Sequence, residues 1–161
     1  LVLFIGFQAV FILADCHSTA TQSAEEFLNA YYALDASAGD MVCSDLTEEG
    51  TDDPMARFLV DVAKEARTLG HTPEYMRSMM MSLHVETVSQ TEDSAVVHVS
   101  GTRKRNINPI FTFIARIPLF NLGKTFPVEK TLKLVKEEGR WRVCNDMFDQ
   151  VHVKHIYGQS I

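Results

Sequence analysis

The 161-residue sequence has few of the residues that interrupt or crosslink a chain: eight glycines, five prolines and three cysteines. So little glycine and proline excludes a collagen-like or low-complexity chain, and 46% apolar with 22% charged residues excludes intrinsic disorder. Basic residues are also few, since 15 of them stand against 21 acidic ones for a net charge of −6. This balance argues against a nucleic-acid partner. The length predicts one folded domain.

The cysteines show no metal-binding pattern. No Cys-x-x-Cys motif occurs, and His152 and His155 have no evident third ligand, so we expect neither a metal nor a cofactor. If Cys16 is removed or modified, Cys43 and Cys144 remain as one pair. In an oxidising compartment this pair would form a disulfide that closes a loop of about 100 residues. The alternative is two separate buried thiols.

The longest apolar run, residues 1–14, is too short to span a bilayer, which takes about 20 residues. Its length matches the apolar core of a secretory signal. Three alternatives follow. Residues 13–16 (LADC) resemble a bacterial lipobox with Cys16 as the lipidated residue, residues 18–20 (STA) fit signal peptidase cleavage, or the segment is retained as an anchor. We therefore assign residues 1–22 to a signal peptide, lipoprotein signal or membrane anchor, and residues 23–161 to a single domain.

Helices are predicted first along the chain. Ser23 and Glu26 have the spacing of a capping box, and the apolar residues that follow recur at helical spacing to about residue 39. A second helix is expected over residues 55–69, with Pro54 in its first turn and Gly70 after its end. A third is expected over residues 73–81, with Thr72 as its N-cap and its methionines as core packing.

From residue 83 the apolar pattern changes to alternation, which predicts a hairpin that turns at residues 90–94. A second hairpin is expected from a strand over residues 130–136, a turn at residues 137–139, and a strand over residues 140–144. Residues 102–127 are the least regular stretch, because Pro109 and Pro118 exclude one continuous central strand there.

This order of elements resembles the nuclear-transport-factor-2-like (cystatin-like α+β) superfamily. The resemblance is carried by residues 24–35 (AEEFLNAYYALD) and 132–143 (LKLVKEEGRWRV) and covers about residues 23–144. Within that superfamily the chain is most similar to bacterial lipoproteins and membrane-anchored proteins of unknown function. The resemblance implies an α+β fold, in which N-terminal helices pack on a curved, mainly antiparallel sheet that forms a cone.

The resemblance also implies a pocket inside the cone, where some relatives use an Asp or an Asp/His pair as a general acid or base. By position, the pocket candidates are Tyr31, Asp35, His98 and Trp141, with Tyr32, His84 and Asp146 as further residues that would approach it. The alternative is that the aromatic residues belong to the core and the polar residues face solvent. Because no residue spacing demands catalysis, we predict that the protein is not an enzyme.

Charge is distributed unevenly along the sequence. Residues 35–65 hold nine acidic and two basic residues, whereas residues 103–142 hold ten basic and three acidic ones. The basic stretch opens with Arg103, Lys104 and Arg105, and an apolar segment with Phe111, Phe113 and Phe120 follows. Such a segment favours a membrane or subunit interface, and the alternative is a strand that completes the core.

These patterns favour a non-catalytic, exported and membrane-tethered binding domain, which serves as an accessory subunit of a cell-envelope assembly. Its expected partners are the membrane, through the N-terminus, and an envelope protein. Its expected location is the periplasmic or extracellular face. The first alternative is a small-molecule carrier or sensor that uses the cone pocket, and a less favoured one is a pocket enzyme of isomerase or dehydratase type.

Overall fold

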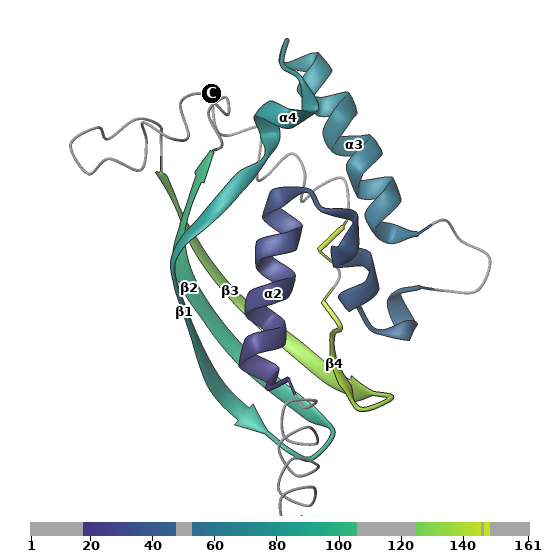
Figure 1. Ribbon diagram of the computed structural model, residues 1–161, viewed down its shortest axis with the longest axis vertical. Coiled ribbons are helices and arrows are strands. Elements are labelled where there is room, and N and C mark those ends of the chain that lie inside the picture. The colour runs from purple at the N-terminus through teal and green to yellow at the C-terminus, as the bar shows by residue number, and fades with distance from the viewer. Residues whose placement is uncertain (1–17, 48–52, 106–124, 146, 149–161) are drawn as a thin grey trace, which may run out of the picture.

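The computed structural model describes residues 18–47, 53–105, 125–145 and 147–148. Helices precede strands along the chain, which confirms the α+β class (Figure 1). The helical part comprises α2 (Ala20–Ala33), η1 (Ala36–Met41), η2 (Ser44–Leu46), α3 (Pro54–Thr68) and α4 (Pro73–Met76), where η denotes a 3-10 helix. The strands are β1 (Ser78–Gln90), β2 (Ser94–Arg105), β3 (Thr125–Glu137) and β4 (Arg140–Val143).

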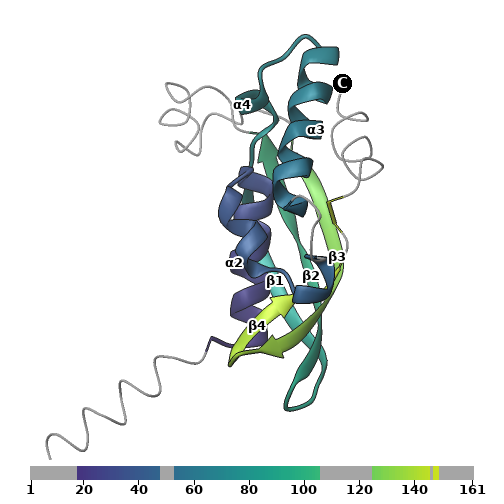
Figure 2. The ribbon, with the colours of Figure 1, turned by 90° about the vertical axis from the view of Figure 1, so that its right-hand side faces the viewer.

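The four strands form one antiparallel sheet in the order β1-β2-β3-β4, and β1 and β4 are its unjoined ends. α2 lies across one face of this sheet and contacts every strand (Figures 1 and 2). Along the outer edge of β4, Val42 forms a parallel bridge with Val143, and the Cys43 amide donates to the Val143 carbonyl over 3.0 Å. The segment between η1 and η2 therefore covers an edge whose backbone groups would otherwise lack partners.

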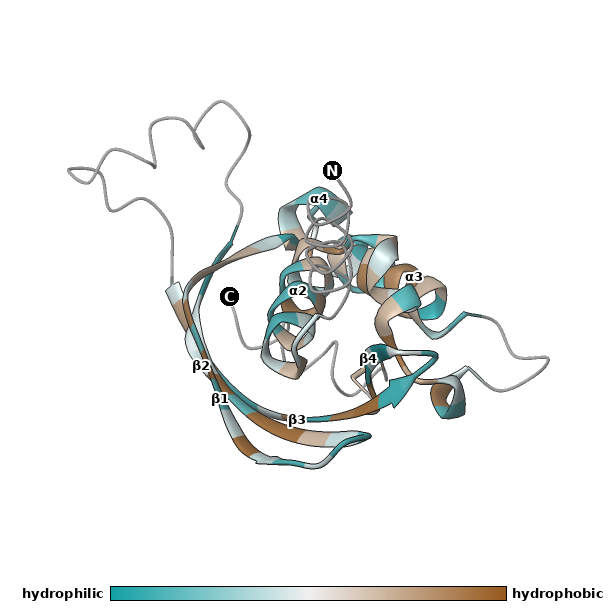
Figure 3. Ribbon diagram, turned by 60° about the horizontal axis from the view of Figure 1, so that its bottom comes forward, coloured by the Kyte–Doolittle hydropathy of each residue, from teal (hydrophilic) through white to brown (hydrophobic). Residues whose placement is uncertain are grey.

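The core lies between α2, α3 and the covered face of the sheet. Figure 3, coloured by hydropathy, shows hydrophobic residues in the strands, α2 and α3, which contribute this core. Alternation along the strands decides which residues enter it, because successive side chains point to opposite faces. The fully buried larger side chains include Phe27, Leu28, Tyr31, Met55, Phe58, Val62, Val97, Leu132 and Leu134.

The predicted capping box at Ser23 and Glu26 is wrong, because α2 begins one turn earlier. Thr19 is the N-cap, with its Oγ1 accepting from the Gln22 amide over 3.2 Å, and Ser23 lies inside the helix. Burial explains the difference, because Ala20 extends the apolar stripe of α2 by one turn and is 1% exposed. The helix also ends earlier than expected, at Ala33, and its C-cap Leu34 has a left-handed φ of 55°.

α3 matches its prediction closely. Pro54 occupies the first turn, and Gly70, with φ of +72°, follows the end of the helix. The sequence pattern did not identify the cap, which is Asp53: its side chain accepts from the Met55 amide over 2.9 Å. A carboxylate at this position also interacts favourably with the positive end of the helix dipole.

The predicted helix over residues 73–81 is wrong after Met76, where α4 ends. Residues 79, 80 and 81 belong to β1 and pair with Lys104, Arg103 and Thr102. Long-range pairing overrides the helix propensity of methionine, which is a weak preference. Met79 and Met81 are 47% and 42% exposed, so of this group Met76 alone is fully buried in the core.

Both predicted hairpins are present, although β3 begins at Thr125 rather than at residue 130. Pro127 is accommodated because it pairs only with Thr102, while β4 reaches no further along β3 than Leu134. The second hairpin turns at Glu138 and Gly139, whose φ angles of 51° and 79° are both positive, as a type I′ hairpin turn requires. Residues 106–124 lie outside the described part, so their assignment to a core strand or to an interface stays a prediction.

Candidate functional site

The structure separates the four predicted pocket residues. Tyr31 is completely buried and donates from its phenol to the Met147 carbonyl over 2.8 Å. Trp141 is 8% exposed in the same core, and the Lys136 ammonium lies 5.9 Å from its ring centroid. His98 lies on the opposite face of the sheet, between the buried Val97 and Val99 in sequence, with its Nε2 3.6 Å from Glu129 Oε1.

Asp35, the fourth, is exposed beyond the end of α2. Its carboxylate accepts from the Ser37 amide over 2.9 Å and caps η1. This hydrogen bond lowers the pKa of Asp35 below its ordinary value. Because His98 and Asp35 lie apart from the buried aromatic pair, the four residues do not line one cavity. His84, on β1, bonds Glu86 over 2.8 Å, and both side chains are exposed. Asp146 and Cys16 lie outside the described residues.

The predicted basic interface is built on the last three residues of β2, and alternation divides them between the two faces. Arg103 points to the core face and is only 6% exposed. Its guanidinium lies 4.8 Å from the Phe126 ring centroid and 5.6 Å from that of Tyr32, and its Nη1 donates to Ser78 Oγ over 3.2 Å. Lys104, half-buried, points to the outer face.

Arg105 returns to the face of Arg103 and stacks on a second set of rings. Its guanidinium lies 5.0 Å from the Tyr75 centroid and 6.0 Å from that of Phe126. Its Nε and Nη2 atoms are buried and have no hydrogen-bond acceptor among the residues that the structure describes. We call Arg103, Arg105, Tyr32, Tyr75 and Phe126 the arginine–aromatic cluster. The described part of the chain stops after Arg105, a member of this cluster, and resumes at Thr125.

The cluster perturbs the ionisation of one of its members. Burial raises the pKa of the Tyr32 phenol, and the nearby charge of Arg103 opposes part of that rise. Tyr32 therefore stays neutral at physiological pH and offers Arg103 a ring face rather than a counter-charge. The positive charges of the cluster are stabilised by aromatic faces. The predicted interface residues Phe111, Phe113 and Phe120 lie outside the described part.

Cys43 and Cys144 form a disulfide across a Cα–Cα distance of 5.2 Å, which confirms the predicted pair. The bond fixes the segment before η2 to the end of β4. A disulfide between residues 101 positions apart is typical of proteins that fold in an oxidising compartment. The disulfide therefore supports an exported location.

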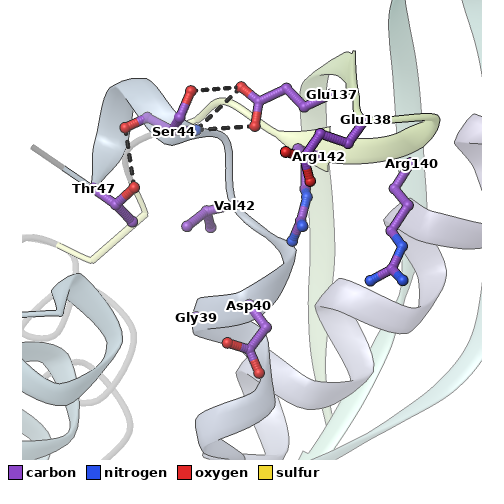
Figure 4. A pocket seen from close by; sticks show the side chains of 9 residues that line it. All are labelled: Gly39, Asp40, Val42, Ser44, Thr47, Glu137, Glu138, Arg140 and Arg142. Carbon is purple, nitrogen blue, oxygen red and sulfur yellow. Dashed lines mark hydrogen bonds between the residues drawn. The ribbon is translucent and has the colours of Figure 1, made fainter.

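Next to the disulfide lies a groove of about 690 Å³ (Figure 4). One wall is the segment from η1 to η2 and the other is the β3–β4 turn. Its lining includes Asp40, Ser44, Glu138, Arg140 and Arg142. A smaller hollow of about 230 Å³ adjoins it, is lined by three of the same residues, and reaches Trp141. Sequence patterns did not identify this groove, because its walls meet through pairing between segments about 100 residues apart.

Besides the groove, sequence patterns did not identify the half-buried Lys130. It pairs with the buried Val99 and shares the core face of β3 with Val128 and Leu132. Burial lowers the pKa of its ammonium. Alternation was the available signal, since Leu132 and Leu134 were expected to point inward and the same period places Lys130 on their face.

Within the residues that the structure describes, no cluster of three or more His, Cys, Asp and Glu side chains has the arrangement of a metal site. None of the described helices combines the length and the apolar character needed to cross a membrane. No protein-family model, curated protein or solved structure matched the chain.

Proposed function

We propose that the protein is a non-catalytic, exported binding domain. In this proposal its N-terminal region tethers it to the membrane, and it serves as an accessory subunit of a cell-envelope assembly. The arginine–aromatic cluster is the observation that carries the proposal. Arginine, tyrosine and other aromatic residues are the types enriched in the energetic centres of protein interfaces.

The unsatisfied donors of Arg105 indicate what the partner offers. Buried guanidinium N–H groups without acceptors cost free energy, and a partner that supplies a carboxylate recovers it. Phe126 lies within 6.0 Å of both guanidinium groups, and Tyr75 covers Arg105. The aromatic rings hold the cations in place before the partner arrives, which lowers the entropic cost of binding. We therefore propose an acidic segment of an envelope protein as the partner.

Two further observations support this reading. The Cys43–Cys144 disulfide fits an oxidising, exported environment. The packing of α2 across one face of an antiparallel sheet fits the nuclear-transport-factor-2-like fold, and we propose membership of that superfamily, with a cone-shaped sheet, as part of the same interpretation.

A photo-crosslinking amino acid in place of Tyr75, whose side chain is 38% exposed, would test the docking site in membranes of the source cell. The proposal expects one discrete crosslinked protein, identified by mass spectrometry as an envelope component. Arg105→Glu should abolish the crosslink, and Arg67→Glu, on the exposed face at the end of α3, should leave it unchanged. Crosslinks to lipid alone would replace the protein partner by an anionic membrane surface. An equal yield with Arg105→Glu would refute docking through the cluster.

A further inference from the structure

The groove beside the disulfide contains charges of both signs that do not pair with each other (Figure 4). Arg140 and Arg142 extend from β4 in the direction of Asp40, and Glu138 lies in the turn before them. The ion pairs of the described residues are Lys64–Asp61, His84–Glu86 and His98–Glu129, none of which involves the groove. The groove thus presents two cationic and two anionic groups that form no ion pair with another described residue.

Arg142 gives the clearest sign that a partner belongs there. Its side chain is half-buried, and its Nε atom is buried without a hydrogen-bond acceptor in the described part of the chain. An unsatisfied donor on a charged group is costly, because its hydration is lost and no interaction replaces it. An oxyanion placed in the groove beside Arg140 and Arg142 would receive charge-assisted hydrogen bonds, and a turn of the Arg142 side chain toward it would satisfy the Nε donor.

The third carboxylate of the groove is already used by its wall. Glu137 accepts from the Ser44 amide over 3.1 and 3.2 Å and from the Ser44 hydroxyl over 2.9 Å. These bonds and the adjacent disulfide hold the η2 segment to the β3–β4 turn. Glu137 therefore stabilises the groove, while Asp40 and Glu138 remain its negative groups. Walls held in this way are organised before a ligand binds.

We propose that this groove binds a small zwitterion of the amino-acid or dipeptide type. The carboxylate of the ligand lies against Arg140 and Arg142, and its ammonium lies toward Asp40. A ligand with charge of one sign would pair with half of these groups and be repelled by the other half. The volume of about 690 Å³ lies within the range of small-molecule sites. This site is separate from the arginine–aromatic cluster and does not depend on the proposed docking function.

The test uses the ¹⁵N-labelled full chain with its disulfide formed, and three probes: the dipeptide Ala-Ala, acetate and ethylammonium. The resonance of the Arg142 Nε–H group reports on the buried donor directly. Titration with Ala-Ala should shift it saturably, with an affinity at least about tenfold higher than that of acetate. Ethylammonium should leave it unchanged. Equal affinity for acetate and Ala-Ala would overturn the zwitterion proposal in favour of a simple anion site, and no saturable shift with Ala-Ala would remove the site altogether.

Variants connect the shift to the groove. Arg140→Gln and Asp40→Asn change exposed side chains and should each weaken Ala-Ala binding about tenfold, read from amide resonances of β4. Arg142→Gln should do the same, although it also alters a half-buried side chain, so the two exposed variants keep the test decisive if it misfolds. Arg67→Gln, on α3, is the matched control and should bind as the parent does. Equal weakening by Arg67→Gln would show non-specific charge binding and overturn the proposal.

Discussion

The phenol of Tyr31 donates a hydrogen bond of 2.8 Å to the backbone carbonyl of Met147, a residue 116 positions away in the sequence. The same ring stacks on Phe58 at a centroid distance of 4.9 Å and meets Phe148 edge-on at 5.8 Å. One side chain of α2 therefore joins α3 and the segment after β4. Because all four residues are buried, this contact holds three separate segments of the chain together in the core.

Tyr31→Phe should lower the free energy of unfolding by about 1–2 kcal/mol, because it keeps the ring packing but leaves the Met147 carbonyl without this donor. Urea denaturation measures the change. Tyr75→Phe is the matched control, since Tyr75 is 38% exposed, and it should change stability by less than about 0.5 kcal/mol. Equal effects of the two substitutions would show that the buried hydrogen bond contributes nothing.

Removing the disulfide with Cys43→Ala and Cys144→Ala together should lower stability by about 2–5 kcal/mol, because the unfolded chain regains the freedom of a loop whose ends are 101 positions apart. Denaturation with and without a reductant measures this effect. The reductant should destabilise the parent protein and leave the double variant unchanged. A parent protein equally stable in both conditions would contradict a structural role for the bond.

Lys130→Met should stabilise the protein at neutral pH by about 1 kcal/mol, because the parent holds a partly desolvated ammonium on the core face of β3. Lys133→Met is the control on the outer face of the same strand, where the side chain is exposed, and it should give no gain. If both variants gained equally, the cause would be a general effect of surface charge.

The pKa of Lys130 also predicts a pH dependence. Burial lowers this pKa in the folded state below the ordinary value of 10.5, so in that range the unfolded chain binds more protons than the folded one. Stability should therefore rise with pH from the lowered pKa up to about 10.5. Lys130→Met should remove this rise in denaturation curves recorded between neutral and alkaline pH. A variant that kept the full rise would assign the pH dependence to another group.

Sequence patterns predicted the elements whose signals are local. Pro54 and Gly70 mark the two ends of α3, and Glu138 and Gly139 form the turn expected between β3 and β4. The pattern failed at Met79 to Met81, where helix propensity favoured a helix and pairing with the far end of β2 produced a strand. That pairing joins segments more than 20 residues apart, so no local signal could have decided it.

The candidate sites were predicted less completely than the fold. The basic run at the end of β2 was identified, but the burial of Arg103 was not, because a charged run is ordinarily exposed. Extending the inward period of Val97 and Val99 would have placed Arg103 and Arg105 on the core face. The groove at Arg142 lacked even this signal, since its two walls meet through the Val42–Val143 bridge, the Ser44–Glu137 hydrogen bonds and the disulfide, which all join distant segments.

Gly101 accounts for one further feature of the sheet, the irregular pairing of β1 with β2 between Met81 and His84. A Cβ atom at Gly101 would lie 3.3 Å from Leu83 Cα, 3.3 Å from Leu83 Cδ1 and 3.3 Å from the Ser82 carbonyl oxygen. Two of these atoms belong to the backbone of the irregularity, where Ser82 has a φ of 50°. The glycine thus leaves room for β1 to approach β2 closely while it bulges.

Gly101→Ala should lower stability by about 1–3 kcal/mol, because backbone atoms cannot move aside as a flexible side chain would. Alanine is otherwise favoured over glycine in strands, so the sign of the change decides the argument. Ser100→Ala, at the preceding residue and on the opposite face, is the control and should stay within about 0.5 kcal/mol of the parent. Hydrogen exchange should locate the loss in the amides of the β1–β2 hairpin. A Gly101→Ala variant at least as stable as the parent would show that the irregularity of β1 does not require the glycine.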